Sequence, residues 1–568
     1  MHVQRFTSLP GDHPLNVVLR TYTLALSLSL GPTLVSLLTS RHARSRGLLV
    51  TLHRILCREL SISGFPFAIT LAVGGGAVLQ RAWTILAASA NVDGVDLRRV
   101  FGERAGARLD DLRMRLSMLA PPHKAFICHA LTSLVSIILM QSRKRSSTPT
   151  PQAPIPYTPP ISNGNGRRIS PTLDLTLLFV VRAMDSLVQR LLFGRQEDES
   201  GEARDRRRRV TTKIDALVFW ASSARIMWCF FYEPNRLPRS YVKWILSLAN
   251  IDRRLVAALQ AIREGRWSYI RGTPGGPNML ADLAQDLGYP RSWAEPGLVP
   301  AFGGPTAASR WAQLGVTGRD TVGGIPCEIV HGAVTGSSCS KNVALRGLYA
   351  FLEAIALYTP ATPPQVHFLP SLLINPRSLL SPPKTAALLF GVLRSASFLS
   401  TFVWSIWASV CLTRTVLLAR LLPFISHDFW DGPFGCIMAG CLACGSGIWI
   451  ENGRRRGEMA LYVLPRAIRS WLPNRWLRSG RRGVIAVERL AYALSLAYLM
   501  TTATHYPASL RGLARWTLAV VTKGGLKRDR QLRTSQNGCT GSSPYSGHDS
   551  ISDSQNGQAT AKSPPTTL

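Results

Sequence analysis

The sequence predicts an all-α, polytopic membrane protein with interfacial helices, a Gly/Pro-rich loop and a disordered C-terminal tail. Charged residues make up only 17% of the 568-residue chain, against roughly 25% in an ordinary soluble domain. The mean hydropathy is positive at +0.09, although a Pro/Ser-rich linker and a polar tail dilute the apolar segments. Several stretches of nearly spanning length lack Asp, Glu, Lys and Arg, and a spanning helix needs roughly 20 apolar residues.

Residues 1–145 are expected to form N-terminal membrane helices, with apolar stretches at 21–38, 60–80 and 125–140. The first stretch is too long for a signal peptide and lacks a small-residue cleavage site, so it predicts a helix kept in the mature chain. Arg81 interrupts the end of the second, where it is a candidate for a pore-facing charge, although snorkelling to the interface is the favoured interpretation. Basic residues flank both ends of several stretches, so the positive-inside rule leaves the topology open.

Residues 173–270 are expected to hold amphipathic or interfacial helices. The segment 174–193 has a polar helical face, and 212–232 ends in a cluster of aromatic residues, which favour the head-group layer. The pair either lies near the membrane interface or forms a helical hairpin buried against the bundle. The polar face consists of Arg182, Asp185 and Gln189.

The remaining segments are distinguished by composition. Residues 146–172 are rich in Ser, Thr and Pro and predict a linker. Residues 271–326 are rich in Gly and Pro and predict a long loop, whereas 327–522 predict a second helical membrane domain with apolar stretches at 395–413, 432–450 and 490–510. Residues 523–568 are polar and predict a disordered tail.

The formal net charge of +34 indicates a phosphate-bearing partner. No zinc-finger spacing or RNA-binding aromatic signature accompanies the arginines, so the expected partner is a bilayer containing anionic lipids, and no nucleic acid is expected. The ten cysteines are scattered, several within apolar stretches, which excludes a secreted disulfide framework.

One Cys/His group has the residue types of a metal site. Cys327 and His331 are spaced i, i+4, and Cys339 follows; sulfur and imidazole both ligate zinc. A structural zinc site usually needs four ligands, however, and no fourth stands nearby in the sequence. Gly332 also favours a loop over a helix. A local structural or redox role is therefore the favoured interpretation, and no metal or other cofactor is expected.

Small residues recur along the apolar stretch 432–450. Such spacing lets a second helix approach closely in lipid. Cys441 and Cys444 have the spacing of a redox pair, but they lie in an apolar helix without a βαβ pattern, so close packing is the favoured interpretation. The predicted packing residues are Gly435, Cys436, Gly440, Cys444 and Gly447.

A dense charge cluster, Glu451, Arg454, Arg455 and Arg456, follows this stretch directly. The arginines either anchor the helix to anionic head groups or pair with Glu451. The alternative is a solvated cluster whose side chains snorkel away from the apolar region.

Several segments occur in an order that resembles the transmembrane protein 135 family over about 327–512. They are Pro326–His331 with Ser338 and Cys339, Ala344–Glu353, Arg394–Phe402 and Ile450–Tyr462. Upstream, Trp220–Arg225 and Glu233–Tyr241 resemble the fungal branch of the family.

The resemblance implies a membrane protein of mitochondria or peroxisomes that acts in organelle dynamics, lipid handling or transport. It also implies distant kinship to mitochondrial translocase channel subunits. One departure is that the family usually has His-Pro where this chain has His331 followed by Gly332.

The favoured function is a non-enzymatic membrane protein that shapes its bilayer or moves something across it, as a homo-oligomer or in a membrane complex. The sequence holds no nucleophile elbow, Walker loop or HExxH motif. One alternative is a membrane enzyme or a redox or metal protein that uses Cys327, His331 and Cys339. Another is a membrane scaffold whose linker and tail recruit partners.

Overall fold

The described residues fold entirely into helices and turns. The computed structural model describes residues 13–39, 53, 55–57, 59–89, 118–142, 170–193, 201–272, 278–319, 321–332, 335–358, 382–473, 476 and 482–524. Within these ranges there is no β-strand, and only two isolated β-bridges occur. The fold class predicted from the sequence is therefore confirmed as all-helical.

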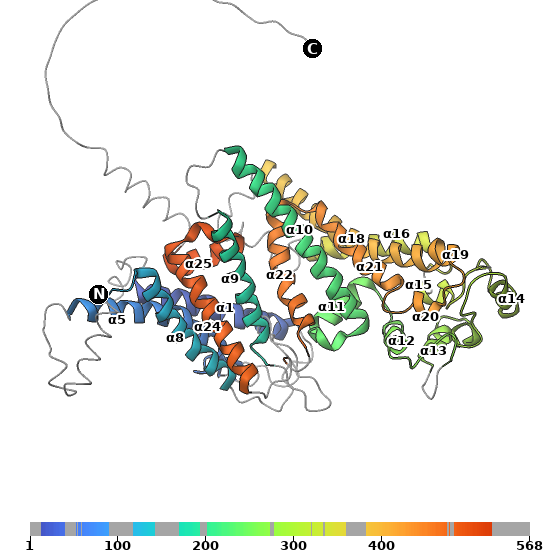
Figure 1. The fold of residues 1–568 in the computed structure, drawn as a ribbon, viewed down its shortest axis with the longest axis horizontal. Helices are drawn as coiled ribbons and strands as arrows, with labels where there is room; N and C mark the ends of the chain where they lie inside the picture. Colours follow the sequence, from blue (N-terminus) through green and yellow to red (C-terminus); the bar gives the residue numbers. More distant parts are fainter. Residues whose placement is uncertain are drawn as a thin grey trace, which may run out of the picture.

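A helical bundle forms one end of an elongated molecule (Figure 1). It combines helices from the start of the chain with helices from its end, and all of them contribute to one hydrophobic core. The segment boundaries predicted from the sequence therefore do not correspond to separate hydrophobic cores, because helices from several predicted segments share this one. The bundle helices are α1 (Pro14–Thr39), α4 (Phe65–Thr70), η2 (Leu71–Gly75), α5 (Gly76–Ser89), α8 (Pro121–Ser142), α9 (Leu173–Phe193), α24 (Arg482–His505) and α25 (Gly512–Lys523).

The second and largest hydrophobic core lies in the middle of the molecule. Its helices come from residues 201–263 and from residues 339–471, so two segments distant in sequence pack side by side. They are α10 (Gly201–Tyr232), α11 (Arg239–Ala249), α12 (Arg253–Arg263), α16 (Cys339–Tyr358), α18 (Pro382–Cys411), α21 (Cys436–Cys444), the 3-10 helix η7 (Gly445–Ile450) and α22 (Gly453–Trp471).

A small folded lobe occupies the other end, where the sequence predicted a long Gly/Pro-rich loop over 271–326. That expectation is wrong, because the segment has its own core around Trp267, Tyr269 and Trp311. Glycines with positive φ, Gly304 and Gly315 among them, join helices too short to give a long periodic pattern. The lobe helices are α13 (Met279–Asp286), η4 (Arg291–Ala294), α14 (Pro305–Leu314), α15 (Cys327–His331) and α20 (His427–Trp430).

Five helical stretches among the described residues are long and apolar enough to cross a membrane. Four coincide with predicted apolar stretches, and the helix predicted at 21–38 forms within α1 but is not among the five. The stretch 432–450 forms a shorter apolar helix, Cys436–Ile450. The five are Phe65–Ile85, Pro121–Ser142, Asp205–Tyr232, Leu389–Leu421 and Arg482–His505.

The pair of segments left open by the sequence, 174–193 and 212–232, packs inside the molecule. α10 is one of the five membrane-crossing candidates and contributes Phe219 and Phe230 to the central core. α9 packs against α22 and α24. Both helices are therefore packed against protein, but they do not form a hairpin with each other, because each packs against α22.

Buried and partly buried ion pairs join α9 and α10 to the C-terminal helices, and we call this group the charged seam. Arg469 Nη1 lies 2.5 Å from Asp174 Oδ2, and both side chains are almost fully buried. Arg182 Nη2 lies 2.9 Å from Glu458 Oε2. Arg511 pairs with both Asp185 and Asp215, the second at 3.0 Å. The polar face predicted on 174–193 thus pairs with protein groups.

Two predicted segments lie outside the described residues. They are nearly all of the linker at 146–172 and nearly all of the tail at 523–568. The scaffold alternative, which depends on them, stays a prediction.

Candidate functional site

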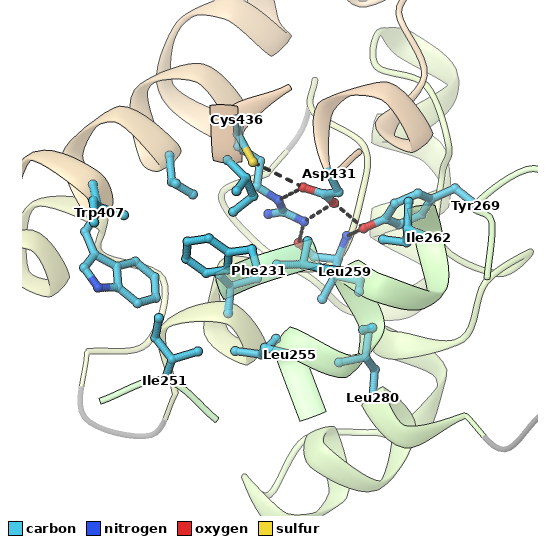
Figure 2. A pocket seen from close by; sticks show the side chains of 17 residues that line it. Phe231, Ile251, Leu255, Leu259, Ile262, Tyr269, Leu280, Trp407, Asp431 and Cys436 are labelled. Carbon is cyan, nitrogen blue, oxygen red and sulfur yellow. Dashed lines mark hydrogen bonds and ion pairs between the residues drawn. The ribbon is translucent and has the colours of Figure 1, made fainter. Parts of the chain in front are cut away.

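An apolar cavity of about 80 Å³ lies where the lobe meets the central helices. Its walls come from α12 on one side and from α18 and α21 on the other. Figure 2 shows Trp407 and Ile251 on the side of the cavity away from Asp431 and Tyr269. Most lining side chains are hydrophobic, among them Phe231, Ile251, Leu255, Leu259, Ile262, Leu280, Ile325, Ile406, Val410 and Ile437.

The polar end of the cavity is built on Arg414. This residue lies in a π-helical turn, η6 (Leu412–Val416), which continues α18, and such turns occur frequently at functional sites. Its Nε lies 2.6 Å from Asp431 Oδ1, and its Nη2 donates to the Ile325 carbonyl at 2.9 Å. The Tyr269 hydroxyl donates to Asp431 Oδ2 at 2.5 Å.

Arg414 keeps one unused donor at this end. The side chain is almost fully buried, and Nη1 has no hydrogen-bond partner among the described residues. A buried donor without a partner loses free energy, so it favours an incoming acceptor. The cavity therefore combines hydrophobic walls with one cationic donor.

The pKa values of Asp431, His427 and Tyr269 determine which of these groups are charged at neutral pH. Burial alone would raise the pKa of the Asp431 carboxyl, but the Arg414 guanidinium outweighs burial and lowers it to about 2. Burial lowers the pKa of His427 to about 3. Burial, with the nearby Asp431 charge, raises the pKa of Tyr269 well above its usual value. At neutral pH the carboxyl is ionised, while the imidazole and the phenol are neutral.

The structure brings together the predicted Cys/His group. Cys327 and His331 are the first and last residues of α15, so the expected loop is in fact a short helix. Their ligand atoms and that of Cys339 all lie within 4.8 Å of one another. Cys411 joins them, with its Sγ 3.5 Å from His331 Nε2. The sequence showed no fourth ligand nearby; in the fold Cys411 contacts His331 but does not belong to the group whose ligand atoms all lie within 4.8 Å of one another.

Two arginines adjoin this group, Arg319, which is buried, and Arg346, which is half-buried. Arg319 Nη1 lies 3.1 Å from Cys327 Sγ. Arg346 Nη2 donates to the His331 carbonyl at 3.1 Å, and its guanidinium stacks 3.9 Å from the Trp407 ring centroid. A hydrogen bond to Cys339 and then burial raise the pKa of the Cys327 thiol to about 12.

The predicted packing residues lie mainly at close helix contacts. A Cβ on Gly440 would stand 3.2 Å from the Ile406 carbonyl oxygen, and one on Gly447 would stand 3.2 Å from that of Phe398. Both contacts are with α18. Cys436 and Cys444 are buried as free thiols.

Gly435 has a different role from the one predicted. It precedes α21, and a Cβ there would stand 2.2 Å from the Trp430 carbonyl oxygen of the preceding turn. It therefore allows a tight turn directly after α20 and does not mediate the approach of a helix distant in the sequence. Cys441 and Cys444 form no disulfide in the structure, and the Cys444 thiol donates to the Cys441 carbonyl at 3.1 Å.

The charge cluster after this helix is mostly internal. Glu451 is buried and accepts a hydrogen bond from Ser395 at 2.5 Å, and Arg455 lies 3.8 Å from it. Arg456 donates to the carbonyls of Glu451 and Trp449 at the end of η7. Arg454 is exposed. Pairing with Glu451 therefore accounts for Arg455, whereas anchoring by the exposed Arg454 stays a prediction.

Arg81 lines a second cavity, about 370 Å³ in volume, in the N-terminal bundle. Its neighbours there include Gln80, Thr84, His129 and Lys523. The Arg81 side chain is largely exposed, as snorkelling requires.

Sequence reasoning missed Cys411, Arg414, Asp431 and Tyr269. Cys411 stands among apolar residues, where a thiol is usually a small core residue. Arg414 carried a weak signal, because it ends an uncharged stretch. Nothing in the sequence connected it to Asp431 or Tyr269.

Comparison with known proteins identifies no relative: no family model, no curated protein and no solved structure matches the chain.

Proposed function

We propose that this chain is a non-enzymatic, multi-pass membrane protein of mitochondria or peroxisomes that binds a fatty acid in the cavity between α12 and α18. The observation that carries the proposal is the unused, buried Nη1 donor of Arg414, a residue that lines the otherwise apolar cavity. The membrane setting is supported by the five long apolar helices. The organelle is supported by the resemblance to the transmembrane protein 135 family.

The cavity suits a single chain with an anionic end. A water molecule requires roughly 10–15 Å³ of cavity volume. A methylene group is of similar size, so a cavity of about 80 Å³ accepts roughly five to eight methylenes. Burying them contributes about 0.8 kcal/mol each. A carboxylate accepting from Arg414 Nη1 adds a charge-assisted hydrogen bond of about 1.5–3 kcal/mol. Asp431 neutralises much of the guanidinium charge, which selects one carboxylate over a multiply charged head group.

Binding of radiolabelled octanoate, whose hydrocarbon chain fits the capacity of the cavity, to the full-length protein in detergent tests this function. The wild-type protein should bind it saturably, and Leu255→Trp should weaken binding by about tenfold or more, because an indole fills the space that several methylenes would occupy. Leu298→Trp is the matched control, since Leu298 is exposed in the lobe and does not line the cavity. No saturable binding, or equal binding by Leu255→Trp, would rule the proposal out.

A further inference from the structure

The four converging Cys and His donors come from three helices that the sequence keeps apart. Cys327 and His331 belong to α15, Cys339 opens α16, and Cys411 ends α18. The lobe thus supplies two donors, and two long central helices supply one each. We propose that Cys327, His331, Cys339 and Cys411 bind one zinc ion, which fastens the lobe to α16 and α18.

The donor spacing fits tetrahedral zinc. With Zn–S bonds of about 2.3 Å and Zn–N bonds of about 2.0–2.1 Å, a tetrahedron places sulfur and nitrogen about 3.6 Å apart and two sulfurs about 3.8 Å apart. Cys411 Sγ and His331 Nε2 are 3.5 Å apart. The donors of Cys327, His331 and Cys339 lie within 4.8 Å of one another, and Cys411 adjoins them through His331, so binding of the ion requires side-chain rotations that draw the four donors together.

The imidazole is already oriented as a ligand. His331 Nδ1 lies 3.0 Å from the Gly336 carbonyl oxygen. A carbonyl only accepts hydrogen bonds, so Nδ1 carries the hydrogen and Nε2 presents a lone pair toward Cys411. Zinc-bound histidines are typically held by such a second hydrogen bond. Arg346, which donates to the His331 carbonyl, fixes the backbone on the other side.

The surrounding charge matches this donor set. Three thiolates and one zinc ion carry a formal net charge of −1, which costs free energy in a buried site unless a cation lies nearby. Arg319 is almost fully buried, and its Nη1 lies 3.1 Å from Cys327 Sγ. Among the described residues, no carboxylate forms an ion pair with Arg319. The thiolate of Cys327 is therefore the counterion that this guanidinium faces.

Four protein ligands leave no open coordination position, which is typical of a structural site rather than a catalytic one. The ion would then contribute directly to the folding of the junction between the lobe and α18. This inference is independent of fatty-acid binding, because its readout is metal content.

Zinc content of the full-length protein, purified in detergent with reductant and without chelator, tests the site. The wild-type protein should hold about one zinc per chain. Cys411→Ser should lower the content about tenfold or more, because it removes one of four ligands. Cys441→Ser is the matched control: its thiol is also buried in an apolar helix, lies outside the cluster, and should leave the content unchanged.

Cobalt substitution distinguishes the loss of a metal ligand from misfolding of a variant. Wild-type protein stripped with a chelator and reloaded with Co²⁺ should show the intense visible absorption of a tetrahedral cobalt–thiolate site. His331→Cys should keep a tetrahedral site but shift that spectrum, which a purely structural histidine would not do. A wild-type protein that takes up neither zinc nor cobalt, or that carries a Cys327–Cys339 disulfide instead, would overturn the proposal, as would equal zinc loss in Cys441→Ser.

Discussion

His427 shows how one buried side chain can make the lobe sensitive to pH. Its ring packs against Gly323 and Gly324, where a Cβ would stand 3.0 and 2.4 Å away, and against the Tyr269 ring. Its backbone N–H donates to the Ala301 carbonyl at 2.8 Å. The ring is fully enclosed, with Nδ1 3.9 Å from Asp431 Oδ2.

Acid should destabilise the lobe through this histidine. Burial holds the pKa of His427 near 3, below its usual 6.5; the Asp431 charge opposes burial without overcoming it, and the charges of Arg414 and Arg319 add to the lowering. The unfolded chain therefore binds a proton that the folded chain does not. Stability is fully present above pH 6.5 and should fall as the pH drops toward 3, by up to about 1.4 kcal/mol per pH unit.

Denaturant unfolding between pH 6.5 and 5 measures this slope before most carboxylates titrate. His427→Gln should flatten it, because glutamine does not titrate. The exposed His123→Gln provides the comparison. If both variants keep the wild-type slope, His427 is not its origin.

At the scale of helices, the small-residue face of α21 and η7 sets how closely α18 approaches. The contacts at Gly440 and Gly447 are with backbone oxygens of α18, which cannot rotate aside as a flexible side chain can. Gly445 does the same toward α10, where its Cβ would stand 2.7 Å from Trp220 Cα. The short helix is thus wedged between two long ones.

Gly440→Leu should disturb this packing. Its Cβ would already be 3.2–3.3 Å from the Ile406 oxygen and Val410 Cγ2, so the rest of the leucine forces the helices apart at a cost of about 1–3 kcal/mol. The midpoint of thermal unfolding in detergent should fall. Ala439→Leu, at a half-buried neighbour, should change it less, and a wild-type midpoint in Gly440→Leu would contradict the packing role.

At the scale of the whole molecule, the sequence predicted features that depend on neighbours along the chain. Uncharged length predicted the spans near 60–80, 125–140, 395–413 and 490–510. Features that depend on residues distant in the sequence were not predicted. Cys411 becomes a candidate ligand only because α18 packs beside α15, and the charges of α9 could not be matched with α22 before the fold was known.

The lobe was missed for a related reason. Helices such as α13 and α14 have 8 and 10 residues, which is marginal for an isolated helix. Their stability comes from packing around Trp311 and Tyr269. The Gly- and Pro-rich composition suggested a loop because nothing local indicated a shared core, and in the structure the positive-φ glycines form turns between the helices.

The intact protein should behave as an integral organelle membrane protein. Because five helices have spanning length, a tagged full-length chain should stay in the membrane pellet after alkaline carbonate extraction and coincide with mitochondrial or peroxisomal markers. Release by carbonate would contradict membrane spanning, and a steady-state location in another organelle would contradict the family-based assignment.

The charged seam also determines when the helices can pack during protein synthesis, because the partners of each ion pair are far apart in the sequence. Asp174 precedes Arg469 by 295 residues, and Asp185 precedes Arg511 by 326. At about 5–20 residues per second, a ribosome leaves the first carboxylate without its partner for about 15–60 seconds. During that interval α9 carries Asp174, Arg182 and Asp185 without their later partners, and lipid does not accept unpaired charges, so its docking must wait for the C-terminal helices. The molecule can close only after translation has nearly finished.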